Sequence, residues 1–147
     1  MAMHTWFECK IRYEKVMENG MQKKVTEPYL VDALSFTEAE ARIIEEMTPF
    51  ISGEFTVSDI KRANYSELFP SDEESADRWF KCKLIFITLD EKSGAEKKTS
   101  TQVLVQAADL RDAVKKLDEG MKGTMADYQI GMVSETPLMD VYLDEEA

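Results

Sequence analysis

The sequence contains two copies of one pattern, and this repeat limits the folds that the chain can adopt. Residues 6–10 read WFECK and residues 79–83 read WFKCK, so four of five letters agree after 73 residues. With one extra residue in the turn that follows, the correspondence continues, and the two copies cover residues 5–69 and 78–142. Because similarity at a fixed spacing indicates duplicated structural units, we expect both copies to fold in the same way.

The first copy predicts a hairpin, a helix and further extended structure. Apolar and charged residues alternate from Phe7 to Glu14, which is typical of a strand with one buried face. Asn-Gly within 18–20 predicts a turn to a second strand over about 22–34. A helix follows, with either Thr37 or Ser35 as its N-cap and Pro49 at its end. Residues 54–63 are predicted to be extended, and 65–69 are a candidate for a short fourth strand.

The second copy repeats this order, with one difference in its first strand. Its turn is KSG at 92–94, and Asp109 is a candidate N-cap for a helix with an apolar stripe. The run LIFITL (84–89) is apolar on both faces, whereas the first copy carries charges there. A strand of this kind is covered on both sides, either by the other copy or by a second molecule of a homo-oligomer.

These elements predict an α+β fold that is built by internal duplication of a ββαβ(β) unit. We expect a single pseudo-dimeric domain over 1–147, with pseudo-twofold symmetry and both helices packed on one side of a mainly antiparallel sheet. Residues 70–77, PSDEESAD, predict an acidic, solvated linker between the repeats. Residues 143–147 predict an acidic tail.

Composition excludes several classes of function. The formal net charge is −11, from 29 acidic and 18 basic residues, which disfavours a nucleic-acid or nucleotide partner. Two cysteines and one histidine, His4, are too few for most zinc sites, and neither glycine-rich phosphate-loop motif occurs. Because we find neither a signal-peptide pattern nor an apolar run of membrane-spanning length, we expect a cytoplasmic protein without a membrane partner. We predict no cofactor, no metal and no catalytic residue.

Four stretches of the chain resemble a known domain family: WFECKIRYEK, YLVDALSFTEAEARI, RWFKCKLIF and EKKT. The family has no established activity, and it occurs in gut Bacteroidetes and in phages that infect them. The resemblance covers nearly the whole chain. It implies a bacterial or phage origin and transfers no site residue.

The candidate binding surface lies on the outer face of the first strand of each copy. If the alternation holds, the cysteines Cys9 and Cys82 point into the core as small hydrophobic residues, and the tryptophans point the other way. An aromatic and basic face of this kind can stack bases or hold an acidic partner; alternatively, the tryptophans cover the sheet rim or the seam between copies, and the lysines protect strand edges. The candidate residues are Trp6, Lys10, Arg12, Trp79, Lys81 and Lys83.

The sequence therefore predicts a non-catalytic binding or interaction protein with a protein partner, in a phage or mobile-element regulatory role. One alternative is a binder of small ligands, nucleotides or single-stranded nucleic acid that uses the tryptophan and lysine face. Another is an enzyme with a site between the repeats.

Overall fold

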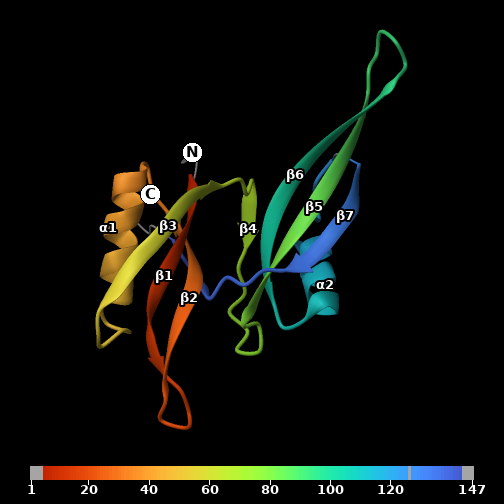
Figure 1. Ribbon diagram of the computed structural model, residues 1–147. Coiled ribbons are helices and arrows are strands. Elements are labelled where there is room, and N and C mark those ends of the chain that lie inside the picture. Colours follow the sequence, from red (N-terminus) through yellow and green to blue (C-terminus); the bar gives the residue numbers. More distant parts are fainter. Residues whose placement is uncertain (1–4, 126, 144–147) are drawn as a thin grey trace. The chain divides into compact units, whose positions relative to one another are not determined.

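The computed structural model describes residues 5–125 and 127–143, and its strands form two four-stranded sheets (Figure 1). The chain divides into two compact units. Unit 1 contains the residues up to Asn64 together with those from Pro137 on, and unit 2 contains Tyr65–Thr136. Unit 1 comprises β1 (Trp6–Val16), β2 (Gln22–Asp32), α1 (Phe36–Met47), β3 (Phe55–Ala63) and β8 (Asp140–Tyr142). Unit 2 comprises β4 (Glu67–Phe69), β5 (Arg78–Leu89), β6 (Glu96–Ala107), α2 (Leu110–Gly120) and β7 (Tyr128–Glu135).

Both sheets have the same arrangement of strands. The order is β3-β1-β2-β8 in unit 1 and β7-β5-β6-β4 in unit 2, and β8 and β4 each pair in parallel with their neighbour. The β1–β3 pairing shifts register between Lys10 and Ile11, and the β5–β7 pairing shifts between Lys83 and Leu84. These two irregularities fall at equivalent positions of the sequence repeat. The duplication itself stays an interpretation of the sequence, with which the shared order and irregularities agree.

The fourth strand of each sheet comes from the other half of the sequence. β4 is the last segment of the first repeat, yet it pairs with β6 of unit 2. β8 is the last segment of the second repeat, and it pairs with β2 of unit 1. The boundaries of the compact units therefore differ from those of the sequence repeats, because the repeats exchange their final strands.

The α+β class is confirmed, and two helices pack on mainly antiparallel strands. The strands form two sheets, however, where the sequence led us to expect one. The reason is that β1 and β5 each have neighbours on both sides within their own unit. Neither central strand has a free edge along most of its length to join a shared sheet.

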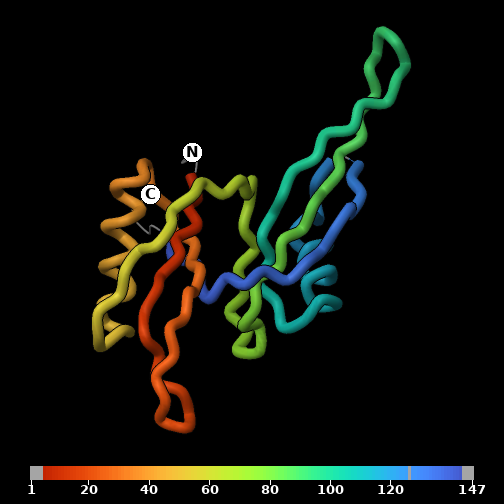
Figure 2. The backbone as a smooth tube through the Cα atoms, viewed as in Figure 1, coloured from red at the N-terminus to blue at the C-terminus, as the bar shows by residue number. Residues whose placement is uncertain are grey.

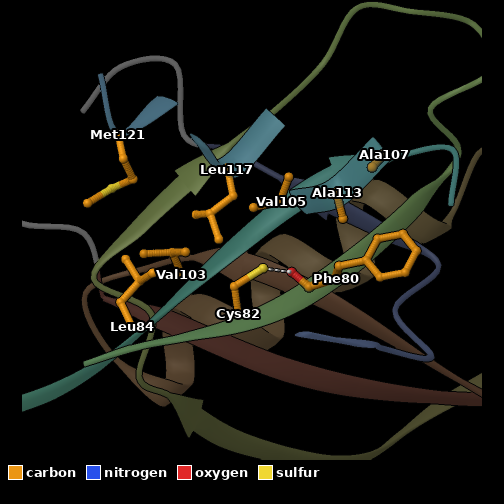
Figure 3. Close-up of a cluster of buried hydrophobic side chains, with 9 residues drawn as sticks. All are labelled: Phe80, Cys82, Leu84, Val103, Val105, Ala107, Ala113, Leu117 and Met121. Atoms are coloured by element: carbon orange, nitrogen blue, oxygen red, sulfur yellow. Dashed lines mark hydrogen bonds between the residues drawn. The ribbon is translucent and has the colours of Figure 1, made fainter. Parts of the chain in front are cut away.

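Each helix packs on its own sheet and completes a separate apolar core. The side chain of Ser35 accepts a hydrogen bond from the Glu38 N–H at 3.1 Å, so Ser35 and not Thr37 is the N-cap of α1. Asp109 caps α2 as predicted, and accepts from the Asp112 N–H at 2.8 Å. Figure 3 shows the core of unit 2, in which α2 places side chains against β5 and β6. Its buried members are Phe80, Cys82, Leu84, Val103, Val105, Ala107, Ala113, Leu117 and Met121.

The hairpin turns and the acidic linker follow the sequence closely. Gly20 and Gly94 adopt φ values of 82° and 71°, which glycine reaches without the steric cost that a Cβ brings. The predicted linker 70–77 is mostly exposed, but it is fastened to unit 2. The Ser71 N–H donates to Gln106 Oε1 at 2.9 Å, and Ala76 is buried. Within the described residues, no helix is long and apolar enough to cross a membrane.

Candidate functional site

The six residues predicted to form a binding surface divide between the two units. Trp6, Lys10 and Arg12 lie on β1, and Trp79, Lys81 and Lys83 lie on β5. Trp79 and Lys83 are the counterparts of Trp6 and Lys10 in the repeat. Both tryptophans alternate with the core residues of their strands, and therefore lie on the sheet face opposite the helix, as predicted. Their side chains are buried, however, with exposed fractions of 4% for Trp6 and 5% for Trp79.

Burial changes what the predicted surface can do. A ring that stacks on a base must present a face to the ligand, and neither tryptophan does so in this structure. The three lysines are half-buried, and Arg12 is exposed. Arg12 lines a cavity.

That cavity has a volume of about 610 Å³, opens to solvent and lies entirely within unit 1. It is bordered by the far half of the β1–β2 hairpin and by the segment that leads from α1 into β3. Figure 2 shows how the hairpin extends beyond the start of β3, which leaves this end of the sheet two strands wide. The lining residues are Arg12, Tyr13, Glu14, Val16, Gln22, Lys24, Ser52, Gly53, Glu54, Phe55 and Thr56.

The lining combines both signs of charge with apolar surface. Arg12 and Lys24 are cationic, Glu14 and Glu54 are anionic, and none of the four forms an ion pair within the part of the chain that the structure describes. Tyr13 and Phe55, which face each other across the β1–β3 pair, supply aromatic surface. These charges are therefore available to a ligand.

Large apolar side chains are exposed around the same end of unit 1. Val16 lines the cavity and is 65% exposed, and Met21 at the hairpin turn is 67% exposed. Phe50, two residues before the lining segment 52–56, is 75% exposed. Exposed apolar residues rimmed by charges are typical of surfaces that bind other molecules.

A buried carboxylate lies beside the cavity, on the helix side of the sheet. Glu27 accepts a hydrogen bond from the Tyr13 hydroxyl at 2.7 Å and a longer one from the Tyr29 hydroxyl at 3.4 Å. The Lys15 ammonium lies 3.5 Å from the other carboxylate oxygen. Burial and the neighbouring Glu27 raise the pKa of Tyr13 to about 12, and burial is the main cause that raises the pKa of Tyr29. This set of residues, Tyr13, Lys15, Glu27 and Tyr29, is called the Glu27 cluster below.

Unit 2 has no counterpart of this cluster among its described residues. The positions equivalent to Tyr13 and Tyr29 are Phe86 and Val103, and Thr101 replaces Glu27. A set without a carboxylate or a tyrosine hydroxyl therefore suffices for this fold. The polar set in unit 1 is a specific departure from it, next to the cavity.

The cysteines are predicted core residues, and the structure confirms this. Cys9 and Cys82 are both fully buried and free, and the Cys82 thiol lies 4.0 Å from the Phe80 carbonyl oxygen (Figure 3). Burial, together with the nearby charge of Glu8, raises the pKa of Cys9 to about 12, and burial raises the pKa of Cys82 to about 11. Neither thiol is accessible or ionised enough at neutral pH to act as a nucleophile.

The structure also brings together a serine and a lysine that no sequence motif indicated. Lys116 on α2 donates to the Ser71 hydroxyl at 3.0 Å, but it also contacts Glu73 and Asp112 at 3.1 Å each. Hydrogen bonds to these two carboxylates raise the pKa of Lys116 against the opposing effect of burial. A lysine that is held protonated cannot remove the serine proton, so this pair fastens the linker to α2 and is no catalytic dyad.

No group of three or more potential metal ligands occurs within residues 5–125 and 127–143. His4, the single histidine, lies outside the described residues.

Comparison with known protein families supplies one match. The model of DUF4494, a domain of unknown function, matches residues 5–144. The chain belongs to the DUF4494 family. Searches among curated proteins and among solved structures find no match. A DUF4494 assignment thus carries no activity, and function has to be argued from the cavity and its surroundings.

Sequence reasoning missed the cavity and the Glu27 cluster. The cavity depends on where β3 begins relative to the hairpin, and boundaries of strands are poorly defined by sequence pattern alone. The cluster did leave a signal, because Tyr13, Glu27 and Tyr29 are positions at which the two repeats differ in polarity.

Proposed function

We propose that the chain is a non-catalytic protein-binding module, and that the end of unit 1 that holds the cavity receives the partner. The observation that carries this proposal is the coincidence, at one place, of a cavity, exposed Val16 and four charges that form no ion pair with any other described residue. An interface of this composition has apolar anchors in its centre and charges that select the partner.

The net charge of −11 favours a partner with a basic surface, because long-range attraction between opposite charges speeds association. The resemblance to a family of gut Bacteroidetes and their phages supports a cytoplasmic setting and a regulatory role in a phage or mobile element. Blocking of a host factor by acidic mimicry is the form of regulation that we propose.

A small-ligand binder is the second candidate. The volume of about 610 Å³ lies within the usual range for ligand pockets, and Arg12 supplies a free cation for an acidic group. The version of this alternative that relies on base stacking has weaker support, because both tryptophans are buried. The enzyme alternative also has weaker support, since the two thiols and the Ser71–Lys116 pair are unsuited to catalysis.

The repeat provides a matched control for the test. Val16 on β1 and Leu89 on β5 are equivalent positions, and both side chains are exposed, at 65% and 69%. Affinity capture from the native cells, with quantitative mass spectrometry, is carried out with the wild type, Val16→Asp and Leu89→Asp. We expect Val16→Asp to lose a specific partner that Leu89→Asp retains. Equal recovery of every captured protein by both variants would show that the end of unit 1 is not the binding surface.

A further inference from the structure

The last three residues of β1 have a neighbouring strand on one side only. β1 pairs with β2 along its whole length to Val16, but β3 begins at Phe55, opposite Tyr13. Glu14–Val16 therefore present an open strand edge on the side of the cavity, and this segment is called the open edge below. Figure 1 shows the β1–β2 ribbon continuing past the start of β3.

The backbone groups of Val16 point toward this open side. In an antiparallel pair, successive residues direct their N–H and C=O groups alternately to one side and to the other. The Met17 N–H donates across the hairpin to the Met21 carbonyl at 2.8 Å, so Val16 faces away from β2. Lys10 lies six residues before Val16 and therefore faces the same side. Its carbonyl accepts a hydrogen bond from the Ser58 hydroxyl of β3, which confirms the direction.

The cavity supplies room for an additional segment along this edge. Its lining includes Glu14 and Val16 on one wall and Ser52–Glu54 on the other, where the chain has separated from β1 before entering β3. An extended peptide in this space would continue the line of β3 beyond Phe55.

We propose that the open edge binds an extended segment of a partner protein by β-strand addition, with backbone hydrogen bonds to Val16. This inference rests on the proposed function and names the mode of recognition. Main-chain pairing supplies affinity in such complexes, and side-chain pockets on alternate positions supply specificity.

The lining defines the chemistry of the segment. Its side chains would alternate between the two faces of the sheet. On the helix side they meet Tyr13 and Phe55, which suits an apolar residue. On the opposite side they meet charges that include Arg12 and Glu14, which suit polar or charged residues. The occupant is therefore an extended segment with alternating apolar and charged residues.

Proline substitution tests the backbone contact directly. Val16→Pro removes an N–H that faces the cavity and takes no part in the β1–β2 pairing, and proline is tolerated at strand edges. Leu89→Pro makes the same change in unit 2. There the Asp90 N–H donates across the hairpin to the Ala95 carbonyl, so the backbone groups of Leu89 face away from β6. The probes are linear peptides selected from a displayed random library on the full-length wild type, then synthesised and titrated.

We expect Val16→Pro to bind the selected peptides about fivefold or more weakly, as loss of one backbone hydrogen bond predicts, and Leu89→Pro to bind as the wild type does. A second measurement leaves the protein unchanged. Methylation of the one peptide nitrogen that donates to the Val16 carbonyl should weaken binding, whereas methylation of the nitrogen on either side of it should not. Circular dichroism of both variants checks that they fold.

Three results would overturn the inference: full affinity of Val16→Pro, equal tolerance of N-methylation at successive positions, or dimerisation of the free chain that Val16→Pro abolishes. The last result would assign the open edge to a second copy. If Val16→Asp loses the cellular partner while Val16→Pro keeps it, the proposed function stands and strand addition fails.

Discussion

The Glu27 cluster allows a stability prediction in which one substitution is costly and three together are not. Tyr13→Phe leaves Glu27 buried without its shortest hydrogen bond, at 2.7 Å. The remaining contacts, at 3.4 Å from Tyr29 and 3.5 Å from the partly exposed Lys15, are long and replace little of it. Because a hydrogen bond to a charged group contributes about 1.5–3 kcal/mol, we expect unit 1 to lose about 2 kcal/mol of its free energy of unfolding.

The triple variant Tyr13→Phe/Glu27→Thr/Tyr29→Val installs the residues that unit 2 carries at these positions. It removes the carboxylate together with both hydroxyl donors, so no buried charge is left without its partners. We expect its unfolding free energy to lie within about 1 kcal/mol of the wild type, since removing a buried charge together with its hydrogen-bond partners is often neutral.

The two cysteines report on the two units separately. Cys9 lies in the core of unit 1 and Cys82 in that of unit 2, and both are fully buried. Thiol labelling across a urea gradient, read by mass spectrometry, gives one midpoint for each. Tyr13→Phe should lower the midpoint at Cys9, the triple variant should restore it, and Cys82 serves as the internal control. A neutral Tyr13→Phe, or a triple variant that is less stable than the single one, would refute this reasoning.

Three further predictions follow from the packing and from the shifted pKa values. The Phe69 ring lies so close to Gly120 that a Cβ added to this glycine would be 2.7 Å from the ring. Because Phe69→Ala would leave a cavity there, we expect it to destabilise unit 2 by about 1–3 kcal/mol. Hydrogen exchange should then accelerate in β5–β7 and not in β1–β3, and the opposite pattern would contradict the exchange of final strands. At pH 8 the thiolate fraction of Cys9 should be about a thousandfold below that of an unfolded cysteine, because its pKa is raised from 9.0 to about 12. Rapid reaction of the folded chain with a thiol reagent would disprove this burial. Burial also raises the pKa values of Tyr13 and Tyr142 to about 12, from an ordinary 10.0. The stability that these protonated groups provide is complete below about pH 10 and is lost as pH rises toward 12. Tyrosinate absorbance and circular dichroism should therefore change together over that interval, and complete titration near pH 10 with unchanged ellipticity would contradict it.

The local structure was predictable because each element has its own periodicity and end signals. The alternation from Phe7 to Tyr13 and the turn glycines Gly20 and Gly94 define the hairpins without reference to the rest of the chain. The burial of Cys9 and Cys82 follows from the same alternation.

The arrangement of the strands was not predictable in the same way. β4 and β8 have three residues each, too few to show which sheet they join, and their partners lie in the other half of the sequence. The burial of Trp6 and Trp79 depends on tertiary packing, which an alternating pattern does not reveal. The cavity depends on the last three residues of β1, which extend beyond the part of the strand that pairs with β3.

The central claim is that the end of unit 1 contacts a partner protein, and site-specific photo-crosslinking in the native cells tests it most directly. A photoreactive phenylalanine analogue placed at Val16 should form a covalent adduct with one protein, whereas the same analogue at the equivalent exposed position, Leu89, should not. Adducts from Leu89 alone, or the same adducts from both positions, would contradict the account.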